Sequence, residues 1–431
     1  MLNFISRRSA GIRRLTLAGL AATAVVLPGC DDNSEPNAPA IIPTPNSIAV
    51  ADITGAGVPD LVVATTADEG FAANPGYANV ILNTPGNLGT FKPGVGYQTT
   101  GTNPSSIAVA DLAGSGGLDL VVANFSSGSV SLFFHGCTTG TCAIGSFKPA
   151  VNVTTGGMPN QVVIADLKGD GRKDLVLADT SAAGNAIVLL ANPSSPGQFL
   201  APMNLPTGKS TPSVAVGDLN GDGAPDIVAA TSDSAGNNGS VYVFMQNASS
   251  RGTFAAPVVY PAGPQPQSVK IADVNGDGLP DIIVANLGPG SDGMGIAGVS
   301  VLLQDKTHPG TFLAPVTFAT AGQSIDVAVQ DLNGDSRPDL VVANLAPLGT
   351  GSVSVLLQLA PPSTGGVAFG SATTYPGFGQ PLGVAIADLN GDGHPDIAVA
   401  DGISATVLFQ SPTSPGTFAQ AVQVGTSPPP F

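Results

Sequence analysis

Short apolar runs recur along the chain in pairs, and each pair is separated by a loop rich in Asp, Asn and Gly. A typical copy is SVAVGDLNGDGAPDIVAAT, which starts at Ser213. Its apolar residues are mostly Val, Ile and Ala in unbroken runs, which is typical of β-strands buried on both faces. Seven such copies follow one another at a spacing of 52 to 59 residues, so the sequence predicts a repeat protein. The copies begin at Ser47, Ser106, Gln161, Ser213, Ser268, Asp326 and Gly383.

A second marker, a Gly shortly before a Phe, gives the same count of repeats. It occurs at Phe91, Phe147, Phe199, Phe254, Phe312, Phe369 and Phe418. The two markers predict four short strands per repeat: one on each side of the Asp-rich loop, a third such as SVSVLLQ, and a fourth after the Phe. A linear β-solenoid is an alternative, but four strands in about 55 residues match a propeller blade. We therefore predict an all-β fold, a seven-bladed β-propeller of four-stranded antiparallel blades, over residues 46–431.

The loop between the first and second strands of each repeat, called here the acidic loop, carries the candidate metal ligands. We number its positions 1 to 9 and the loops 1 to 7 in chain order. Loops 4 to 7 follow DxNxDGxxD or a near copy, with side-chain oxygens at positions 1, 3, 5 and 9 and a backbone carbonyl expected at position 7. Such an all-oxygen set is typical of calcium in an EF-hand loop and fits magnesium less well. The predicted ligands are Asp218, Asn220, Asp222, Ala224 and Asp226; Asp273, Asn275, Asp277, Leu279 and Asp281; Asp331, Asn333, Asp335, Arg337 and Asp339; and Asp388, Asn390, Asp392, His394 and Asp396.

A tight Asn-Gly turn without metal is the simpler interpretation of these loops. Three carboxylates within nine residues would however repel one another unless a cation lies between them. Loop 3 keeps Asp166, Asp170 and Asp174 but has Lys168 at position 3, where an ammonium would compete with the ion. Loops 1 and 2 have lost too many oxygens, so we expect about four calcium ions, with loop 3 as a fifth candidate. In loop 6, Ser336 replaces the Gly at position 6, where a left-handed bend is expected, so strain is predicted there.

With these loops the chain resembles the FG-GAP or VCBS repeat family, the propeller class that includes the head of integrin α subunits. The resemblance covers about residues 46–431. It implies a seven-bladed propeller with calcium in the acidic loops, at the positions given above. The GAP triplet is replaced by VAN, VAT or VAD, and the FG pair survives only at Phe369-Gly370. This places the chain with the bacterial relatives, and no integrin ligand-binding residue carries over.

The first 30 residues have the features of an export signal and are not counted in the fold. Two Arg pairs precede an apolar run, Leu15 to Leu27, which is short for crossing a bilayer. The sequence that ends at Cys30 resembles a bacterial lipobox, whose Cys is acylated, although Pro28 departs from it and leaves plain cleavage open. Residues 31–45 look like a Pro-rich tether. We expect export by the Sec or twin-arginine route and a membrane link only through a lipid on Cys30.

The charge of the chain is concentrated in the acidic loops. Two acids in each of loops 1 and 2, and three in each of the other five, account for 19 of the 30 acidic residues. Without the four signal arginines the net charge is −20, and four calcium ions would bring it to −12. A surface this acidic repels phosphate backbones, which argues against nucleic acid as a partner.

Cys137 and Cys142 are the two cysteines of the predicted domain. In an oxidising compartment we expect them to close a small disulfide loop. Two free thiols are the alternative, and a zinc site would have His135 as its only further ligand nearby.

Length differences among the repeats suggest a binding surface. The loops between second and third strands vary most, and the longest are TTADEGFAANPGYA in the first repeat and LGPGSDGMGIAG in the fifth. Because variable loops on a rigid scaffold commonly carry recognition, we predict that the chain, as a monomer, binds a protein or glycan at the end opposite the acidic loops. Loop variation without function is the simpler alternative.

An enzyme such as a polysaccharide lyase is the second functional hypothesis. His135, His308 and His394 are the only histidines, and they lie in three different repeats with no nucleophile and base close together in sequence. The chain also has no Trp, the best side chain for stacking on a sugar. A purely structural role in the cell envelope is the third hypothesis.

Overall fold

The computed structural model describes residues 44–66, 75–136, 146–232, 239–288, 297–346, 350–360, 366–402 and 404–424. The predicted export signal with Cys30, nearly all of the predicted tether, and the cysteines Cys137 and Cys142 lie outside these residues. So do the central parts of the two longest predicted loops. Within the described residues, no helix is both long enough and apolar enough to cross a membrane.

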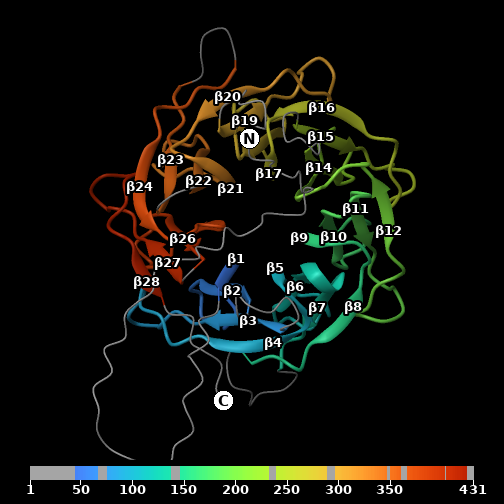
Figure 1. Ribbon diagram of the computed structural model, residues 1–431, viewed down its shortest axis with the longest axis horizontal. Coiled ribbons are helices and arrows are strands. Elements are labelled where there is room, and N and C mark those ends of the chain that lie inside the picture. The colour runs from blue at the N-terminus through green and yellow to red at the C-terminus, as the bar shows by residue number, and fades with distance from the viewer. Residues whose placement is uncertain are drawn as a thin grey trace, which may run out of the picture.

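The described chain forms seven four-stranded antiparallel sheets arranged as the blades of a ring, which confirms the predicted fold (Figure 1). In every sheet the strands pair in chain order, so each blade consists of four consecutive strands. The innermost strands lie around the centre of the ring. They are β1 (Thr44–Ala51), β5 (Pro104–Ala110), β9 (Pro159–Ala165), β13 (Ser213–Gly217), β17 (Pro266–Ala272), β21 (Gln323–Gln330) and β25 (Gly383–Ala387).

The second strand is the most buried part of each blade. These strands are β2 (Asp60–Thr66), β6 (Asp119–Asn124), β10 (Asp174–Asp179), β14 (Asp226–Ser232), β18 (Asp281–Asn286), β22 (Asp339–Leu345) and β26 (Asp396–Ala400). Nearly all of their side chains are buried, because the neighbouring blades cover both faces of the sheet. This burial explains the unbroken apolar runs of the sequence.

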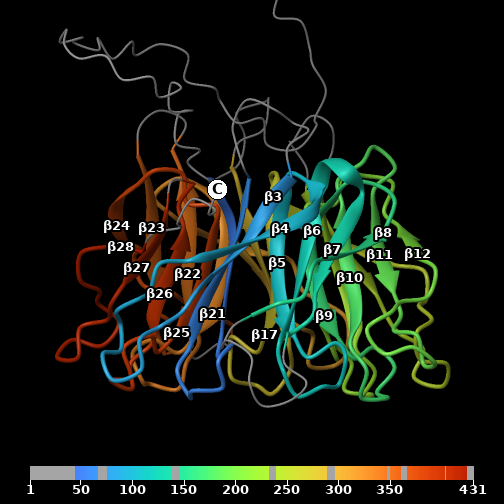
Figure 2. The same ribbon diagram turned by 90° about the horizontal axis from the view of Figure 1, so that it is seen from below.

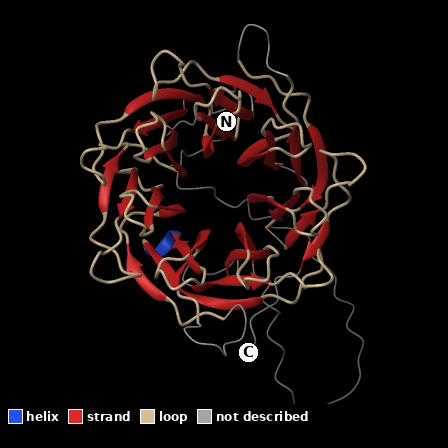
Figure 3. Cartoon of the chain, turned by 180° about the vertical axis from the view of Figure 1, so that it is seen from behind, coloured by secondary structure: helices blue, strands red, loops and turns tan. Residues whose placement is uncertain are grey.

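The third strands are almost as buried, whereas the fourth strands form the outer edge of the ring. The third strands are β3 (Pro75–Ile81), β7 (Ser129–Phe133), β11 (Asn185–Leu189), β15 (Gly239–Phe244), β19 (Gly298–Leu302), β23 (Gly351–Leu356) and β27 (Ala405–Leu408). The fourth strands are β4 (Val95–Thr102), β8 (Val151–Thr154), β12 (Met203–Pro206), β16 (Val258–Gly263), β20 (Val316–Ala319), β24 (Thr373–Phe378) and β28 (Val422–Val424). Most residues of the fourth strands are exposed or half-buried. Figure 3 shows strands around the whole ring, with one short 3-10 helix, η1 (Phe125–Ser127).

The hydrophobic core is divided among the junctions between blades. Each of seven core clusters is shared by two neighbouring blades, and one of them joins blade 7 to blade 1. In that cluster Ile48 and Leu61 pack with Leu389 and Val407. Among the described residues, the ring therefore closes by side-chain packing and by a hydrogen bond from the Asn83 amide to the Leu389 carbonyl at 2.7 Å, without a strand shared between its first and last blades.

The Phe marker has a defined place at these junctions. Each of the seven Phe side chains packs in the cluster that its blade shares with the preceding blade. Its backbone forms an isolated antiparallel bridge to the residue two places after the third strand. We call this residue the bridge residue; the seven are Asn83, His135, Ala191, Gln246, Gln304, Gln358 and Gln410. The marker thus fixes the turn between the third and fourth strands.

Side-chain hydrogen bonds also link the innermost strands at six of the seven junctions. The first residue of each aligned sequence copy provides the side chain, as when Ser106 Oγ accepts the Val162 N–H at 3.2 Å. Ser47, Gln161, Ser213 and Asp326 each accept a backbone N–H of the next blade in the same way. Between blades 5 and 6 the link joins two side chains, because Ser268 Oγ donates to Asp326 Oδ1 at 2.7 Å. At the junction of blades 7 and 1 the same position is Gly383, which has no side chain. We call this position the latch position.

The acidic loops and the loops between second and third strands lie at opposite ends of the ring (Figure 2). They do so because strand direction alternates within a blade. The connection from the first to the second strand has eight residues in every blade. The connection from the second to the third strand ranges from four residues, between β6 and β7, to eleven, between β18 and β19.

Candidate metal centre

All seven acidic loops have the same backbone shape. Positions 4 and 6 have positive φ in every loop, and both are Gly except at Ser336, where φ is 65°. A left-handed backbone costs a residue with a Cβ atom about 1 kcal/mol. The strain predicted for loop 6 is therefore confirmed.

The aspartate at position 1 holds this backbone in place. In every loop its Oδ2 accepts the N–H of position 6 at 2.7–2.9 Å. Its Oδ1 accepts the N–H of position 5 at 3.0–3.2 Å. Loops 1 and 2 make these bonds although they lack a carboxylate at position 5. An Asp at position 1 is therefore a turn-forming residue, as is common for Asp side chains that bond to nearby backbone.

The aspartate at position 9 is buried in all seven blades and connects the loop to the third strand. None of these seven side chains is more than 1% exposed. Oδ2 accepts the N–H of position 2 at 2.9–3.0 Å. Oδ1 accepts the N–H of the bridge residue at 2.7–2.8 Å. One carboxylate thus joins the acidic loop to the segment that contains the Phe marker.

Burial raises the pKa of these position-9 carboxyl groups. It raises the pKa of Asp281 to about 7 and that of Asp226, Asp339 and Asp396 to about 6. The pKa values of Asp60, Asp119 and Asp174 are raised as well. Loss of hydration is the largest cause, the other acids of each loop add to it, and the two backbone N–H groups oppose it.

The side chain at position 3 bonds back to the loop. In loops 4 to 7 the Asn Oδ1 accepts the N–H of position 5 at 2.9–3.0 Å. In loop 1 the hydroxyl of Thr54 accepts the same N–H at 3.3 Å. The turn therefore uses an oxygen at position 3 where the sequence offers one.

The carboxylate at position 5 is not needed for the turn. In loops 4 to 7 its Oδ1 accepts the N–H of position 7 at 2.8–3.0 Å. Ala56 and Ser115 stand at this position in loops 1 and 2. There position 1 still accepts the N–H groups of positions 5 and 6, and position 9 still accepts the N–H of position 2. The acids at position 5 thus add charge to the loop without being required for its fold.

The second oxygen of the position-5 carboxylate has different partners in different loops. Asp222 Oδ2 and Asp392 Oδ2 accept an Asn amide of their own loop at 3.0 and 3.1 Å. The guanidinium groups of Arg172 and Arg337 contact Asp170 Oδ2 and Asp335 Oδ2. Asp277 Oδ2 is buried without a hydrogen bond and lies 3.3 Å from Lys306 Nζ.

The donor chemistry of loops 4 to 7 fits a hard divalent cation. Every predicted side-chain ligand is a carboxylate or an amide oxygen. Asp277 Oδ2 is buried without a hydrogen bond, which fits an oxygen that faces a cation; here Lys306 Nζ lies 3.3 Å from it. Within the described residues, no three acidic, His or Cys side chains lie close enough together to hold a metal as they stand. The carboxylates at positions 1 and 9 point toward backbone N–H groups. In loops 4 to 7 the position-1 Oδ1 accepts two of them, from positions 4 and 5. The position-1 Oδ2 and both oxygens at position 9 accept one each, which leaves each of these oxygens a second lone pair for an ion.

The three histidines lie in separate blades, as their sequence positions predict. His135 packs edge-on against Phe147 and lines a surface pocket of about 270 Å³ beside loop 2, together with Asp119 and Lys148. His308 is on an exposed turn, where its Nδ1 lies 3.2 Å from Asp305 Oδ2. His394 is at position 7 of loop 7, and its N–H donates to Asp392 Oδ1.

The FG-GAP-like repeat model matches the chain in four places, residues 111–177, 166–229, 218–284 and 331–399. Together these segments cover more than half of the 431 residues. The chain belongs to the FG-GAP-like repeat family. Each match starts at a position-1 aspartate and ends in the second strand of the following blade. The family resemblance and the seven-bladed propeller that it implied are confirmed, and no curated protein matches the chain.

Three features of the FG-GAP-like loops were missed from the sequence. The first is the structural role of the position-9 aspartate, and its presence in all seven loops was an available signal. The second is the left-handed backbone at position 4, where Gly also occurs in all seven copies. The third is the pairing of Asp170 and Asp335 with arginines two residues further along the chain.

Proposed function

We propose that this FG-GAP-like propeller is an exported interaction module, stabilised by calcium in loops 4 to 7 and held at the bacterial envelope by a lipid on Cys30. Its partner, a protein or glycan, binds at the end opposite the acidic loops. The propeller acts as a monomer.

One observation carries the calcium part of this proposal. The turn forms in loops 1 and 2 without a carboxylate at position 5, so the acids at this position in loops 4 to 7 need another reason. Repulsion between them and the aspartates at positions 1 and 9 is a cost that a bound cation removes. The side-chain ligands would be the residues at positions 1, 3, 5 and 9, and position 7 would supply a carbonyl. The ion would neutralise each loop and tie its two strands together, which stabilises the fold.

Elemental analysis of the purified, dialysed chain tests the metal. We expect about four calcium ions per chain, one for each of loops 4 to 7. A double variant, Asn220→Ala with Asp222→Ser, gives loop 4 the residues of loop 2 at positions 3 and 5. It should lose one ion and about 2.7 kcal/mol of calcium-dependent stability at a calcium concentration 100 times the dissociation constant, with little change in chelator. Fewer than about three ions in the unmodified chain would contradict the assignment.

The difference between the two ends of the ring supports the position of the binding surface. At the acidic end the connections from first to second strand have eight residues in every blade, and those from third to fourth strand have 13 residues in five of the seven blades. The connections between second and third strands range from four to eleven residues. A constant length is expected where the loop has one structural task, and a variable length is typical of loops that contact partners.

A partner screen tests the interaction module. The soluble domain, residues 46–431, is presented to glycan and envelope-protein arrays with calcium and with chelator. Residues 67–74 and 287–297 are then each replaced by the short connection of blade 2, residues 125–128, so that the flanking strands stay intact. We expect binding that depends on calcium and is lost in at least one graft. Unchanged binding in both grafts would contradict the proposed surface, and cleavage of an acidic polysaccharide with new ultraviolet absorbance would favour an enzyme instead.

Lipid labelling of the full chain in a bacterial host tests the anchor. We expect incorporation of a labelled fatty acid and partition into detergent, both lost in Cys30→Ala. Release of a soluble chain by the unmodified sequence would contradict lipidation but not export.

A further inference from the structure

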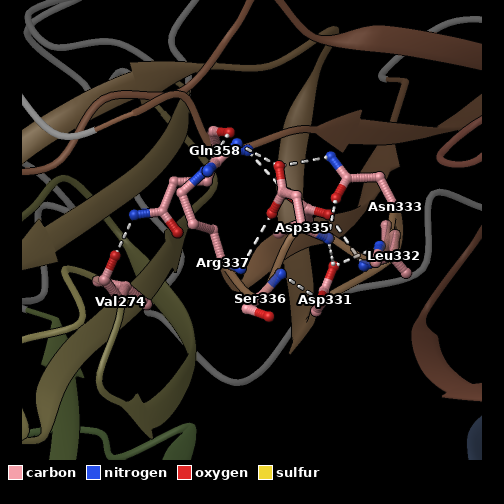
Figure 4. A network of polar contacts seen from close by, with 10 residues as sticks. Val274, Asp331, Leu332, Asn333, Asp335, Ser336, Arg337 and Gln358 are labelled. Carbon is pink, nitrogen blue, oxygen red and sulfur yellow. Dashed lines mark hydrogen bonds and ion pairs between the residues drawn. The ribbon is translucent and has the colours of Figure 1, made fainter.

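In loop 6 the position-5 carboxylate is already paired with a cation of its own loop (Figure 4). Arg337, at position 7, places its guanidinium against Asp335 Oδ2. The Asn333 amide donates to the same oxygen at 3.0 Å. A carboxylate oxygen offers about two lone pairs. Both lone pairs of Asp335 Oδ2 are therefore occupied, and Oδ1 accepts the backbone N–H of Arg337.

Arg337 is also held in position by the neighbouring backbone. Its Nε donates to the Gln358 carbonyl at 3.4 Å, and its N–H donates to Asp335 Oδ1 at 3.0 Å. Gln358 is the bridge residue of this blade, and its own N–H is fixed by Asp339 at 2.7 Å. The side chain of Arg337 is 37% exposed, so the pair is only partly screened by water. The guanidinium is thus held at Nε by the Gln358 carbonyl, and the backbone N–H of Arg337 is held by Asp335 Oδ1, so the positive charge is placed in advance beside the carboxylate.

Two other loops contain a comparable pair. In loop 3 the position-7 residue is Arg172, and its guanidinium contacts Asp170 Oδ2. In loop 5 the cation comes from the turn after the third strand, where Lys306 Nζ lies 3.3 Å from Asp277 Oδ2. The Lys306 side chain is 68% exposed, so this cation is held less firmly than the two arginines.

Loops 4 and 7 differ from these three. Among the described residues, no basic side chain pairs with Asp222 or Asp392. Position 7 is Ala224 in loop 4 and His394 in loop 7. Arg251 reaches loop 4, but it donates to the carbonyl of Gly223 at 2.8 Å and not to a carboxylate. In both loops Oδ2 of the position-5 carboxylate has a lone pair free.

We infer that Arg337 is a built-in counterion that competes with the divalent cation in loop 6, and that Arg172 and Lys306 have the same effect in loops 3 and 5. The inference rests on the proposed calcium function and deepens it. A free ion must displace the guanidinium or bind beside a positive charge, and either lowers its affinity. Loops 4 and 7 therefore fill first, while loops 3, 5 and 6 balance part of their charge without metal.

Calcium titration by calorimetry of the chelator-stripped domain tests this division. We expect two tight sites in the unmodified chain, with the other sites weaker. Arg337→Gln should convert one weak site into a tighter one, with a dissociation constant lower by about tenfold, because one positive charge beside the ion is removed. Lys306→Gln should have a smaller effect in the same direction. The matched control is Lys92→Gln, which removes an exposed charge in blade 1, whose loop has no acid at position 5.

The reverse change places the same cation in an open loop. His394→Arg gives loop 7 the position-7 residue of loop 6 and should remove one of the two tight sites. In chelator, the melting temperature of His394→Arg should be equal to or above that of the unmodified chain. Added calcium should raise the melting temperature of the variant by less than it raises that of the unmodified chain. This melting readout shows whether a weakly binding variant is folded.

The outcomes separate the inference from the calcium proposal. The first outcome is that the unmodified chain, Arg337→Gln and His394→Arg all bind calcium with the same number of sites and the same dissociation constants. This would overturn the counterion role and leave the proposed function standing. Binding in Arg337→Gln but not in the unmodified chain would support the counterion role and overturn calcium as the native ligand. No binding in any variant would overturn both.

Discussion

Blades 1 and 2 and blades 4 to 7 have the same acidic-loop backbone but different acids. In both regions position 1 accepts the backbone N–H groups of positions 5 and 6, and position 9 accepts that of position 2. In blades 4 to 7 position 1 also accepts the N–H of position 4 at 2.6–2.8 Å. Only the second region carries Asn at position 3 and Asp at position 5. The sequence motif of these loops therefore has two parts with different roles. The aspartates at positions 1 and 9 form the hairpin, and the residues at positions 3 and 5 add side-chain oxygens.

The comparison changes how each acidic residue is interpreted. An Asp at position 9 is evidence for a folded blade, since it occurs in loops where no metal is expected. An Asp at position 5 is evidence for a ligand, since the turn forms without it. Four predictions test this division, from the largest expected effect to the smallest.

Removal of the position-9 carboxylate should destabilise both regions equally. Asp119→Ala in blade 2 and Asp226→Ala in blade 4 each leave the position-2 and bridge-residue N–H groups without their buried acceptor. We expect a loss of about 3 kcal/mol or more in each variant, measured by denaturant unfolding in chelator. A small loss in Asp119→Ala with a large loss in Asp226→Ala would break the comparison, because it would make position 9 important only where metal is proposed.

The junction at which blade 7 meets blade 1 can be strengthened. A Cβ atom at Gly383 would lie 3.6 Å from Ile48 N and meet only ordinary contacts. Gly383→Ser should place a hydroxyl at the empty latch position and raise the free energy of unfolding by about 1 kcal/mol. Ser106→Ala, which removes an existing latch, should lower it by a similar amount. A gain in Gly383→Ala equal to that in Gly383→Ser would assign the effect to the backbone and not to the hydrogen bond.

Relief of the strained backbone in loop 6 should give a smaller gain. Ser336 has φ of 65°, in the same left-handed region as the Gly at this position in the other loops, where φ is 79–85°. We expect Ser336→Gly to raise stability by about 0.5 kcal/mol, since removal of the left-handed strain is partly offset by the greater freedom of Gly in the unfolded chain. Gly116→Ser in loop 2 should give the opposite change. Thermal unfolding in chelator measures both.

The pH dependence of blade 2 should reflect its buried carboxyl group. Burial raises the pKa of Asp119 above its ordinary value of 3.8. Its folded-state pKa then exceeds its unfolded pKa, so its contribution is fully present below about pH 4 and is lost as pH rises through the folded pKa. The stability difference between the unmodified chain and Asp119→Asn should therefore shrink as pH rises from 4 to 7 in chelator. A difference that grows with pH would mean that the carboxylate is favoured in the folded state.

The repeat made most of the fold predictable. Seven copies of an apolar run, an acidic loop and a second run define the first two strands of each blade, and the Phe marker fixes the start of the fourth. Burial on both faces is predicted by unbroken apolar runs such as DLVVAN. This run forms the whole of β6 and all of β22 except its last residue. These features depend on local sequence, which repeats are well suited to reveal.

The hydrogen bonds of the candidate site were much less predictable. The partner of Asp226 Oδ1 is the Gln246 N–H, 20 residues further along the chain. The partner of Arg337 Nε is the carbonyl of Gln358, 21 residues away. Such contacts depend on strand register and on neighbouring blades. The sequence could identify which loops carry ligand-type residues, but not which oxygens were already occupied.

Each blade is made from four consecutive strands. The chain could therefore begin at a different blade without any change in the strand pairing within the blades. New termini placed in any connection from a fourth strand to the next first strand would leave all seven sheets paired. By the same reasoning, duplication or deletion of a genetic segment of one repeat adds or removes a whole blade and never half of one. One repeat of the sequence thus corresponds to one blade of the fold. In a rearranged chain, the junction at Gly383 between blades 7 and 1 must still form.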